Sequence, residues 1–161
     1  MKHRVVITGM GVVAPNAVGL DNFLEAIQQG RSGITFHQKL QDLKFSCCIG
    51  GIPPVSEEIK NKYLTPLQLR GFDSAGILYG CIAGMDAWKD AGFVIDKNSP
   101  IDYNSGMVFG TGTSGIEKFR EAIYKLDDQK VKRLGSTVVV QTMASGISAY
   151  LGGILGMGNQ V

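Results

Sequence analysis

The chain has 161 residues, of which 44% are hydrophobic, and its formal net charge is +2 at pH 7. This length suits one domain and the apolar content suffices for a buried core, so we expect a folded chain. The weak, scattered positive charge does not indicate a nucleic-acid partner, and the lack of a long apolar run or a secretory signal predicts a cytoplasmic protein without a membrane span.

The first predicted element is a short strand at Val5–Thr8, which we expect to be buried on both faces because it is continuously apolar. A glycine turn follows it. The next element is a helix over Asp21–Gln29, with its large apolar residues on one face and its end at Gly30. After an irregular region, Lys44–Ile52 has the pattern of a strand that two prolines close.

Two helix signals follow in the middle of the chain. Thr65-Pro66-Leu67-Gln68 has the form of a capping box with proline at the first helical position. The longest helical pattern covers Gly71–Ala91, where Gly76, Gly80 and Gly84 recur at four-residue intervals and permit close approach of a neighbouring backbone. Charged residues punctuate this segment, so we expect a helix within a large soluble core and not a membrane helix.

The second half repeats the alternation of strand and helix. Met107–Phe109 is predicted as a short buried strand, and Ile116–Leu126 as a helix. The apolar face of that helix comprises Ile116, Phe119, Ile123 and Leu126. We expect an extended connection over Gly135–Gln141 and a helix rich in small residues over Met143–Leu155. Together these elements predict an α/β architecture with right-handed crossovers.

The cysteines and histidines do not indicate a metal site. Cys47, Cys48 and Cys81 lack CxxC spacing, and His3 and His37 are the only histidines, so we expect no metal. Cys81 lies in an apolar helical stretch, where cysteine acts as a small buried hydrophobe. Cys47 and Cys48 lie on a predicted strand and should face opposite ways, and neither has the setting of an activated thiolate. Both histidines are expected at the surface.

A glycine motif offers an alternative function. Gly110–Gly115 matches GxGxxG between a predicted strand and a predicted helix, which is the setting of a dinucleotide-binding turn. The stretch Ser136–Thr142 beyond the helix contains no acidic residue that could bind ribose hydroxyls. A looser GxGxxA match at Gly9–Ala14 runs into Pro15, which opposes a helix there. A small Rossmann-like nucleotide-binding module therefore stays open as an alternative.

Four segments point to a family. They are VVITGMGVVAP with the later GRSGI, the helix end DAWKDAGF, VFGTGTSGIEKF, and TMASGISAYLGGILGMGNQV. In this order they resemble β-ketoacyl-acyl carrier protein synthases of the elongating, KAS II-like type, members of the thiolase superfamily. The resemblance implies a thiolase-like α/β fold in which residues 1–161 form the N-terminal half of a layered α-β-α-β-α architecture. It also implies that a strand with the nucleophilic cysteine follows Val161.

The family's reaction is a decarboxylative Claisen condensation of acyl and malonyl acyl-carrier-protein thioesters in fatty-acid or polyketide biosynthesis. The resemblance implies a catalytic cysteine and two catalytic histidines, and it places none of them in this chain, which alone is expected to be inactive. No cofactor is implied. The implied partners are acyl carrier protein, acyl thioesters and a second subunit in a homodimer, or the missing C-terminal half. A noncatalytic partner of a complete synthase is the other alternative.

The resemblance also implies a substrate site. It places Gly112, Thr113 and Ser114 near the deep end of an acyl pocket, close to the twofold interface, and Met143 near the approach to the nucleophile. The volume of Thr113 would set the depth of the pocket. The glycine-lined helix is expected to pack against the absent half, which would leave an apolar surface exposed in the isolated chain.

Overall fold

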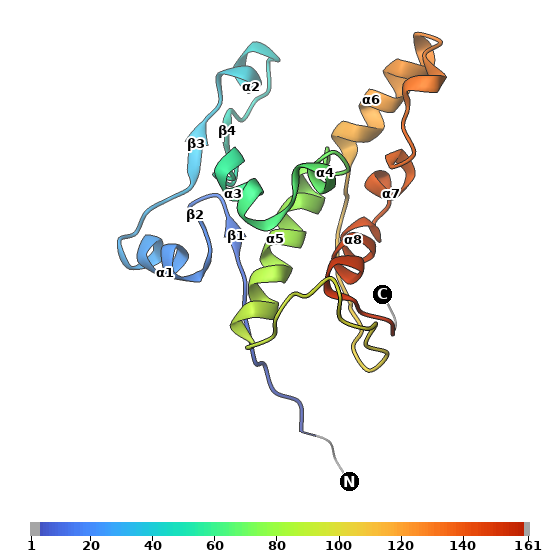
Figure 1. Ribbon diagram of the computed structural model, residues 1–161. Helices are drawn as coiled ribbons and strands as arrows, with labels where there is room; N and C mark the ends of the chain where they lie inside the picture. Colours follow the sequence, from blue (N-terminus) through green and yellow to red (C-terminus); the bar gives the residue numbers. More distant parts are fainter. Residues whose placement is uncertain (1–3, 160–161) are drawn as a thin grey trace.

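The computed structural model describes residues 4–159 as an assembly of helices with two small antiparallel sheets (Figure 1). β1 (Val13–Ala14) pairs with β2 (Ala17–Val18), and β3 (Ile34–Phe36) pairs with β4 (Ile49–Gly51). The helices are α1 (Leu20–Gln28), α2 (Gln38–Asp42), α3 (Glu57–Tyr63), α4 (Pro66–Leu69), α5 (Ala75–Asp90), α6 (Ile116–Asp127), α7 (Val138–Thr142) and α8 (Gly146–Leu155), with a 3₁₀ turn at Val131–Arg133.

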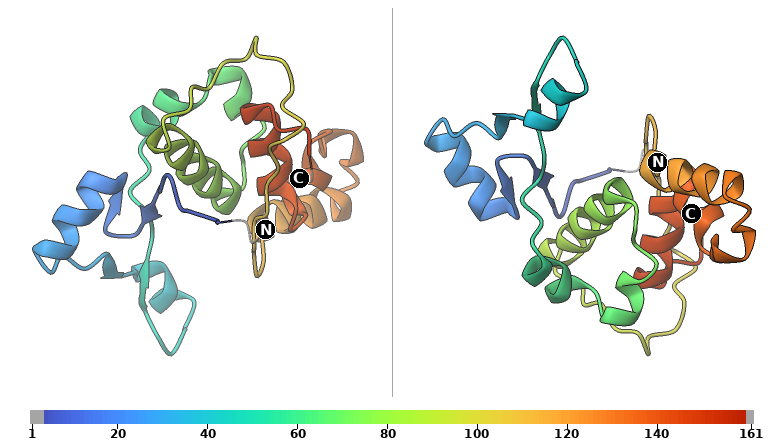
Figure 2. Two further views of the ribbon diagram at one scale, coloured as in Figure 1. Left: turned by 90° about the horizontal axis from the view of Figure 1, so that it is seen from below. Right: turned by 90° about the horizontal axis from the view of Figure 1, so that it is seen from above.

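The helix α5 lies between two groups of elements. The sheets, α1 and α2 lie on one side of it, and α6, α7 and α8 lie on the other, as all the views show (Figures 1 and 2). The buried core forms mainly where α5 packs against α8. Its buried residues are Leu64, Ile77, Leu78, Cys81, Ile82, Met85, Ile147 and Leu151.

The glycines of α5 explain how closely the two helices approach. A β-carbon on Gly84 would overlap the side chain of Leu151 on α8, and one on Gly80 would come within 2.9 Å of Ile147. A β-carbon on Gly76 would meet nothing within 4 Å. The expectation that this glycine-lined helix packs against an absent half is therefore wrong for Gly80 and Gly84, because α8 of the same chain covers them.

The two predicted buried strands are not formed. Val5–Thr8 and Met107–Phe109 are irregular, and Val5, Ile7 and Val108 are 93%, 88% and 99% exposed. A strand is stabilised by hydrogen bonds to neighbouring strands, and within residues 4–159 no strand pairs with either segment. The two segments therefore have the apolar composition of a buried strand, but no neighbouring strand pairs with them and their side chains stay exposed.

Several shorter predictions hold. α1 and α6 lie within a few residues of their predicted bounds, and Gly30 ends the first helical segment with a φ of 63°. The capping box at Thr65 is confirmed, because its hydroxyl accepts from the Gln68 N–H while the Gln68 side chain accepts from the Thr65 N–H. The predicted strand over Lys44–Ile52 is shorter than expected and is limited to β4.

The prediction of an extended connection over Gly135–Gln141 is wrong, because the end of this segment is helical and belongs to α7. The valine run favours a strand by propensity, but the Gln141 side chain is held in the interior and the Thr142 hydroxyl donates to the Val138 carbonyl at 3.1 Å. α5 and α8 begin at Ala75 and Gly146, a few residues later than their patterns indicated. Tertiary contacts at these helix starts outweigh the local pattern.

Candidate functional site

The predicted substrate residues lie in a shallow cavity of about 330 Å³ at the start of α6. Gly112, Thr113 and Ser114 line one side of it, and Thr142 at the end of α7 and Ala144 just beyond that helix also line it. The hydroxyl of Thr111 donates to the Ala144 carbonyl at 3.4 Å. Three of the four predicted residues, which are consecutive in sequence, therefore line one cavity with a segment about thirty residues later.

The fourth predicted residue, Met143, does not line this cavity although its two neighbours do. Its side chain is 48% exposed. The Oγ atom of Ser114 is buried and has no hydrogen-bond partner among residues 4–159. A buried hydroxyl without a partner is unusual in a folded protein.

The walls of the cavity are fixed by a close backbone contact. Gly115, the N-cap of α6, has a φ of 67°, and a β-carbon on it would overlap the backbone carbonyl of Gln141. Glycine adopts this left-handed conformation without steric cost and leaves room for the carbonyl. The contact sets the spacing between the Gly112–Ser114 loop and the end of α7.

Gln141 joins this contact to the start of α5. Its side chain is fully buried, and its Oε1 accepts hydrogen bonds from the backbone N–H groups of Asp73 and Ser74 at 2.8 and 3.1 Å. Its Nε2 donates to the hydroxyl of Thr137 at 3.0 Å. These bonds satisfy backbone donors that a helix start leaves without an intrahelical partner. Sequence reasoning missed this residue, although a single amide within the apolar run VVVQTM is a recognisable signal.

A charged cluster fixes α6 against the same helix start. Lys118 is only 7% exposed, and its Nζ lies 2.5 Å from Asp73 Oδ2 and 3.0 Å from Glu121 Oε2. Burial opposes the charged form of Lys118, but hydrogen bonds to both carboxylates outweigh this effect and raise its pKa. Hydrogen bonds from Lys125 and Lys118 lower the pKa of Glu121. The carboxylate of Glu117 also accepts from the Ala75 N–H at 2.7 Å.

None of the cysteines has the surroundings of a nucleophile. Burial raises the pKa of Cys81 to about 12, so its thiol stays protonated at neutral pH, as its predicted role in the core requires. Cys47 and Cys48 precede β4, and their thiols donate to the carbonyls of Ile49 and Phe45. His3 lies outside the described residues. His37 is half-buried and not simply at the surface, because its Nε2 lies 3.0 Å from the Gly50 carbonyl.

The structure does not support the alternative of a dinucleotide-binding turn. The GxGxxG motif at Gly110–Gly115 needs a preceding strand, and the segment before it is irregular. Within residues 4–159, no group of three or more His, Cys, Asp or Glu side chains could hold a metal ion. In the same part of the chain, no helix is long and apolar enough to cross a membrane.

Comparison with known proteins identifies the family. The family described as "Beta-ketoacyl synthase, N-terminal domain" matches residues 2–158. The chain belongs to the β-ketoacyl synthase family. It is 29% identical to the chloroplastic 3-oxoacyl-(acyl-carrier-protein) synthase I of Arabidopsis thaliana, over 97% of this chain and 33% of the relative. It is 30% identical to 3-oxoacyl-(acyl-carrier-protein) synthase 1 of Escherichia coli K12, over 92% of this chain and 36% of the relative.

Solved structures show the same fold. A β-ketoacyl synthase from Burkholderia phymatum superposes with a TM-score of 0.77 at 22% identity, covering 97% of this chain and 38% of that one. The ketosynthase of a type II polyketide system, solved with its acyl-carrier protein, gives 0.73 at 20% identity, covering 100% of this chain and 42% of that one. The chain therefore has the thiolase-like α/β fold of the N-terminal part of ketosynthases, and it spans about a third of the length of the curated relatives it matches.

Proposed function

We propose that this chain forms the N-terminal part of an enzyme that condenses acyl and malonyl acyl-carrier-protein thioesters by decarboxylative Claisen chemistry, in fatty-acid or polyketide biosynthesis. The observation that carries the proposal is the family match over residues 2–158. The cavity that Gly112, Thr113 and Ser114 line supports it, because these consecutive residues lie in the segment that the resemblance assigned to the acyl pocket.

In this proposal the chain supplies the pocket and not the reactive groups. Condensation needs a thiolate that accepts the acyl group and donors that stabilise the enolate and the oxyanion. Cys81 is buried and protonated, and Cys47 and Cys48 lie beside a hairpin strand. The Nε2 atom of the half-buried His37 lies within hydrogen-bond distance of the Gly50 carbonyl in the same hairpin. We therefore assign the nucleophilic thiol and the imidazoles to a part of the enzyme other than the described residues 4–159.

The cavity is suited to hold an alkyl chain. Ile116 and Phe119 add apolar side chains to the loop and to the end of α7. We propose that Thr113 limits the length of the acyl chain, because its side chain belongs to the loop that forms one wall. A role of Met143 near the nucleophile stays a prediction.

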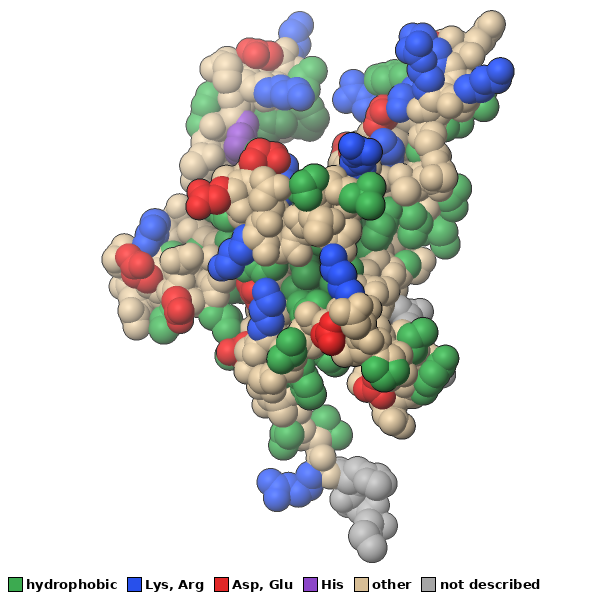
Figure 3. All heavy atoms as spheres, in the orientation of Figure 1, with side chains coloured by type: hydrophobic (Ala, Val, Ile, Leu, Met, Phe, Trp, Pro, Cys, Tyr) green, Lys and Arg blue, Asp and Glu red, His purple; other side chains and the backbone are tan. Residues whose placement is uncertain are grey.

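We also propose that two copies of the chain pair through α6. The apolar face predicted for this helix is left open, with Ile116 60%, Phe119 58%, Ile123 42% and Leu126 57% exposed. Hydrophobic side chains also show on the surface beside α6 and α7 (Figure 3). An exposed apolar face of this kind marks a protein-interaction site. An acyl carrier protein is the proposed second partner, supported by the related ketosynthase solved with one. A cytoplasmic location stays a prediction.

The proposal is tested on the protein encoded by the complete reading frame in which this sequence lies. Formation of 3-oxoacyl-carrier protein and release of CO₂ are measured from acyl- and malonyl-carrier protein. The triple variant Cys47→Ser, Cys48→Ser, Cys81→Ala is compared with the parent. We expect both proteins to turn over, because the thiol that forms the acyl-enzyme is none of these three. Loss of turnover in a folded triple variant would refute this assignment.

A further inference from the structure

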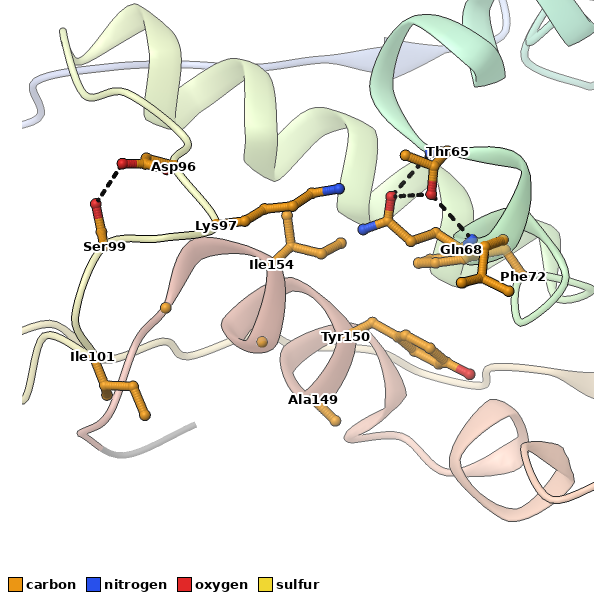
Figure 4. A pocket seen from close by; sticks show the side chains of 13 residues that line it. Thr65, Gln68, Phe72, Asp96, Lys97, Ser99, Ile101, Ala149, Tyr150 and Ile154 are labelled. Atoms are coloured by element: carbon orange, nitrogen blue, oxygen red, sulfur yellow. Dashed lines mark hydrogen bonds between the residues drawn. The ribbon is translucent and has the colours of Figure 1, made fainter.

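A second hollow, of about 580 Å³, lies outside the acyl-pocket candidate, between α4, α8 and the loop after α5 (Figure 4). Its size is that of pockets that bind small molecules. Phe72, Ile101, Tyr150 and Ile154 form apolar parts of its lining. The rings of Phe72 and Tyr150 pack with centroids 4.6 Å apart, and the Tyr150 hydroxyl donates a hydrogen bond to the Gly71 carbonyl at 3.0 Å. These contacts hold the two aromatic side chains of the lining in place.

Two nitrogen donors point into this hollow. Figure 4 shows the side chains of Lys97 and Gln68 converging on the same space. The Gln68 Oε1 already accepts from the N–H and hydroxyl of Thr65, which turns its NH₂ group outward, and Lys97 has no ion-pair partner among residues 4–159. The carboxylate of Asp96, which also lines the hollow, accepts from the Asn98 N–H and the Ser99 hydroxyl and keeps its negative charge, so an anionic head group must lie on the side of Lys97 and Gln68.

A neighbouring hollow of about 560 Å³ extends the positive region. It shares Lys97 and Gln68 with the first and adds Lys62 and Lys89, whose ammonium groups lie over the ring of Tyr63 at 5.6 and 4.9 Å. Neither of these two lysines forms an ion pair in the described part of the chain. The carboxylate of Asp86 accepts a hydrogen bond from the Tyr63 hydroxyl.

We propose that this hollow binds a single-chain anionic amphiphile. Lys97 and Gln68 hold its head group by charge-assisted and neutral hydrogen bonds, and its alkyl chain lies along Phe72, Tyr150 and Ile154. Both a long-chain carboxylate and a phosphate monoester of a long-chain alcohol have this chemistry. A neutral amphiphile leaves the ammonium group of Lys97 without a counter-charge, and a cationic one is repelled. This site is independent of the proposed condensation and of the cavity at α6.

The test uses the full chain and titration calorimetry with dodecanoate and dodecyl phosphate, each below its critical micelle concentration, and with dodecanol as the neutral probe. We expect saturable binding of at least one anion, at least tenfold tighter than dodecanol, and the preferred anion identifies the head group. Lys97→Met should weaken that binding about tenfold, the scale of one charge-assisted hydrogen bond. Lys39→Met, which removes an exposed lysine on α2, is the matched control and should leave it unchanged.

A second variant tests the alkyl channel without removing charge. A side chain at Gly153, which lines the hollow, meets no atom within 4 Å, so Gly153→Leu should fill the space, leave the fold intact and abolish binding. Gly76→Leu introduces the same side chain into open space on α5 and should bind as the parent does. A dodecanoate analogue with a diazirine should cross-link to residues 149–156. Equal affinity for dodecanol, unchanged affinity in both Lys97→Met and Gly153→Leu, or cross-links confined to residues 112–119 would overturn the proposal.

Discussion

The backbone carbonyl of Gln141 lies against the α-carbon of Gly115, in the space that a β-carbon would occupy. This contact joins the end of α7 to the start of α6, and the loop before α6 carries three residues of the candidate acyl cavity. Because Gln141 also caps the start of α5 through its side chain, one residue sets the relative positions of three helices. The geometry of the cavity therefore depends on residues that do not line it.

Replacement of Gly115 tests that contact. Gly115→Ala places a β-carbon on the Gln141 carbonyl and forces alanine into a left-handed conformation, so we expect the free energy of unfolding to fall by about 2–4 kcal/mol. Gly110→Ala is the control, because its β-carbon meets nothing within 4 Å, and it should change stability by less than about 0.5 kcal/mol. Urea unfolding followed by circular dichroism measures both. Equal stability of the two variants would show that the contact is not constraining.

Replacement of Gln141 tests the cap on α5. Gln141→Met keeps the size of the side chain but leaves the N–H groups of Asp73 and Ser74 without their acceptor, which should cost about 1–3 kcal/mol of unfolding free energy. Gln28→Met changes an exposed glutamine on α1 and serves as the control. Amide hydrogen exchange should show faster exchange at residues 73–77 in Gln141→Met only. Unchanged protection there would argue against the cap.

The ion pairs of α6 predict a specific pH dependence. The pKa of Glu121 is lowered in the folded chain, so its contribution to stability is present above the pKa of about 4.3 expected for the unfolded chain and is lost as the pH falls through the folded value. Glu121→Gln should therefore flatten the loss of stability below about pH 4.3. Glu58→Gln removes an exposed carboxylate of α3 and should leave the slope unchanged. Parallel slopes for the parent and Glu121→Gln would contradict the prediction.

The exposed face of α6 predicts self-association. Phe119→Asp places a charge on this apolar face, and we expect it to weaken dimer formation at least tenfold in sedimentation equilibrium. Val94→Asp introduces the same charge at a residue that is 83% exposed in a loop, and it should associate as the parent does. A parent that stays monomeric throughout the concentration range would remove the basis for pairing through α6.

The volume of Thr113 should set the acyl length. Thr113→Phe enlarges a side chain in the wall of the cavity, so the complete enzyme should lose activity on long acyl thioesters more than on short ones, by tenfold or more in the ratio of kcat/KM values. Thr35→Phe, on β3 outside the cavity, should leave that ratio unchanged. A uniform loss at all chain lengths would indicate a structural role for Thr113 and not a selective one.

Local signals predicted the helices better than the strands. α6 and the capping box at Thr65 depend on contacts within one or two turns, and both are confirmed. Val5–Thr8 has the composition of a strand, but a strand also depends on partners distant in the chain, which no local pattern contains. The end of the valine run is helical because Gln141 binds the start of α5, a contact between residues 67 or 68 positions apart.

The same distinction applies to the candidate site. Gly112, Thr113 and Ser114 were predicted because their segment of consecutive residues resembles the family, and all three line one cavity. Thr142 and Ala144 complete it from a segment about thirty residues later, which only the tertiary structure could identify. Met143 lies between Thr142 and Ala144 in sequence, but it does not line the cavity.

The rate of 3-oxoacyl-carrier-protein formation tests the central claim most directly. It is measured with purified residues 1–161 alone and with the product of the complete reading frame, using the same acyl- and malonyl-carrier-protein substrates. We predict turnover by the complete product and none by residues 1–161, because the thiols in this segment are buried or lie beside a hairpin strand. Condensation by residues 1–161 alone, or none by a folded complete product, would contradict the account.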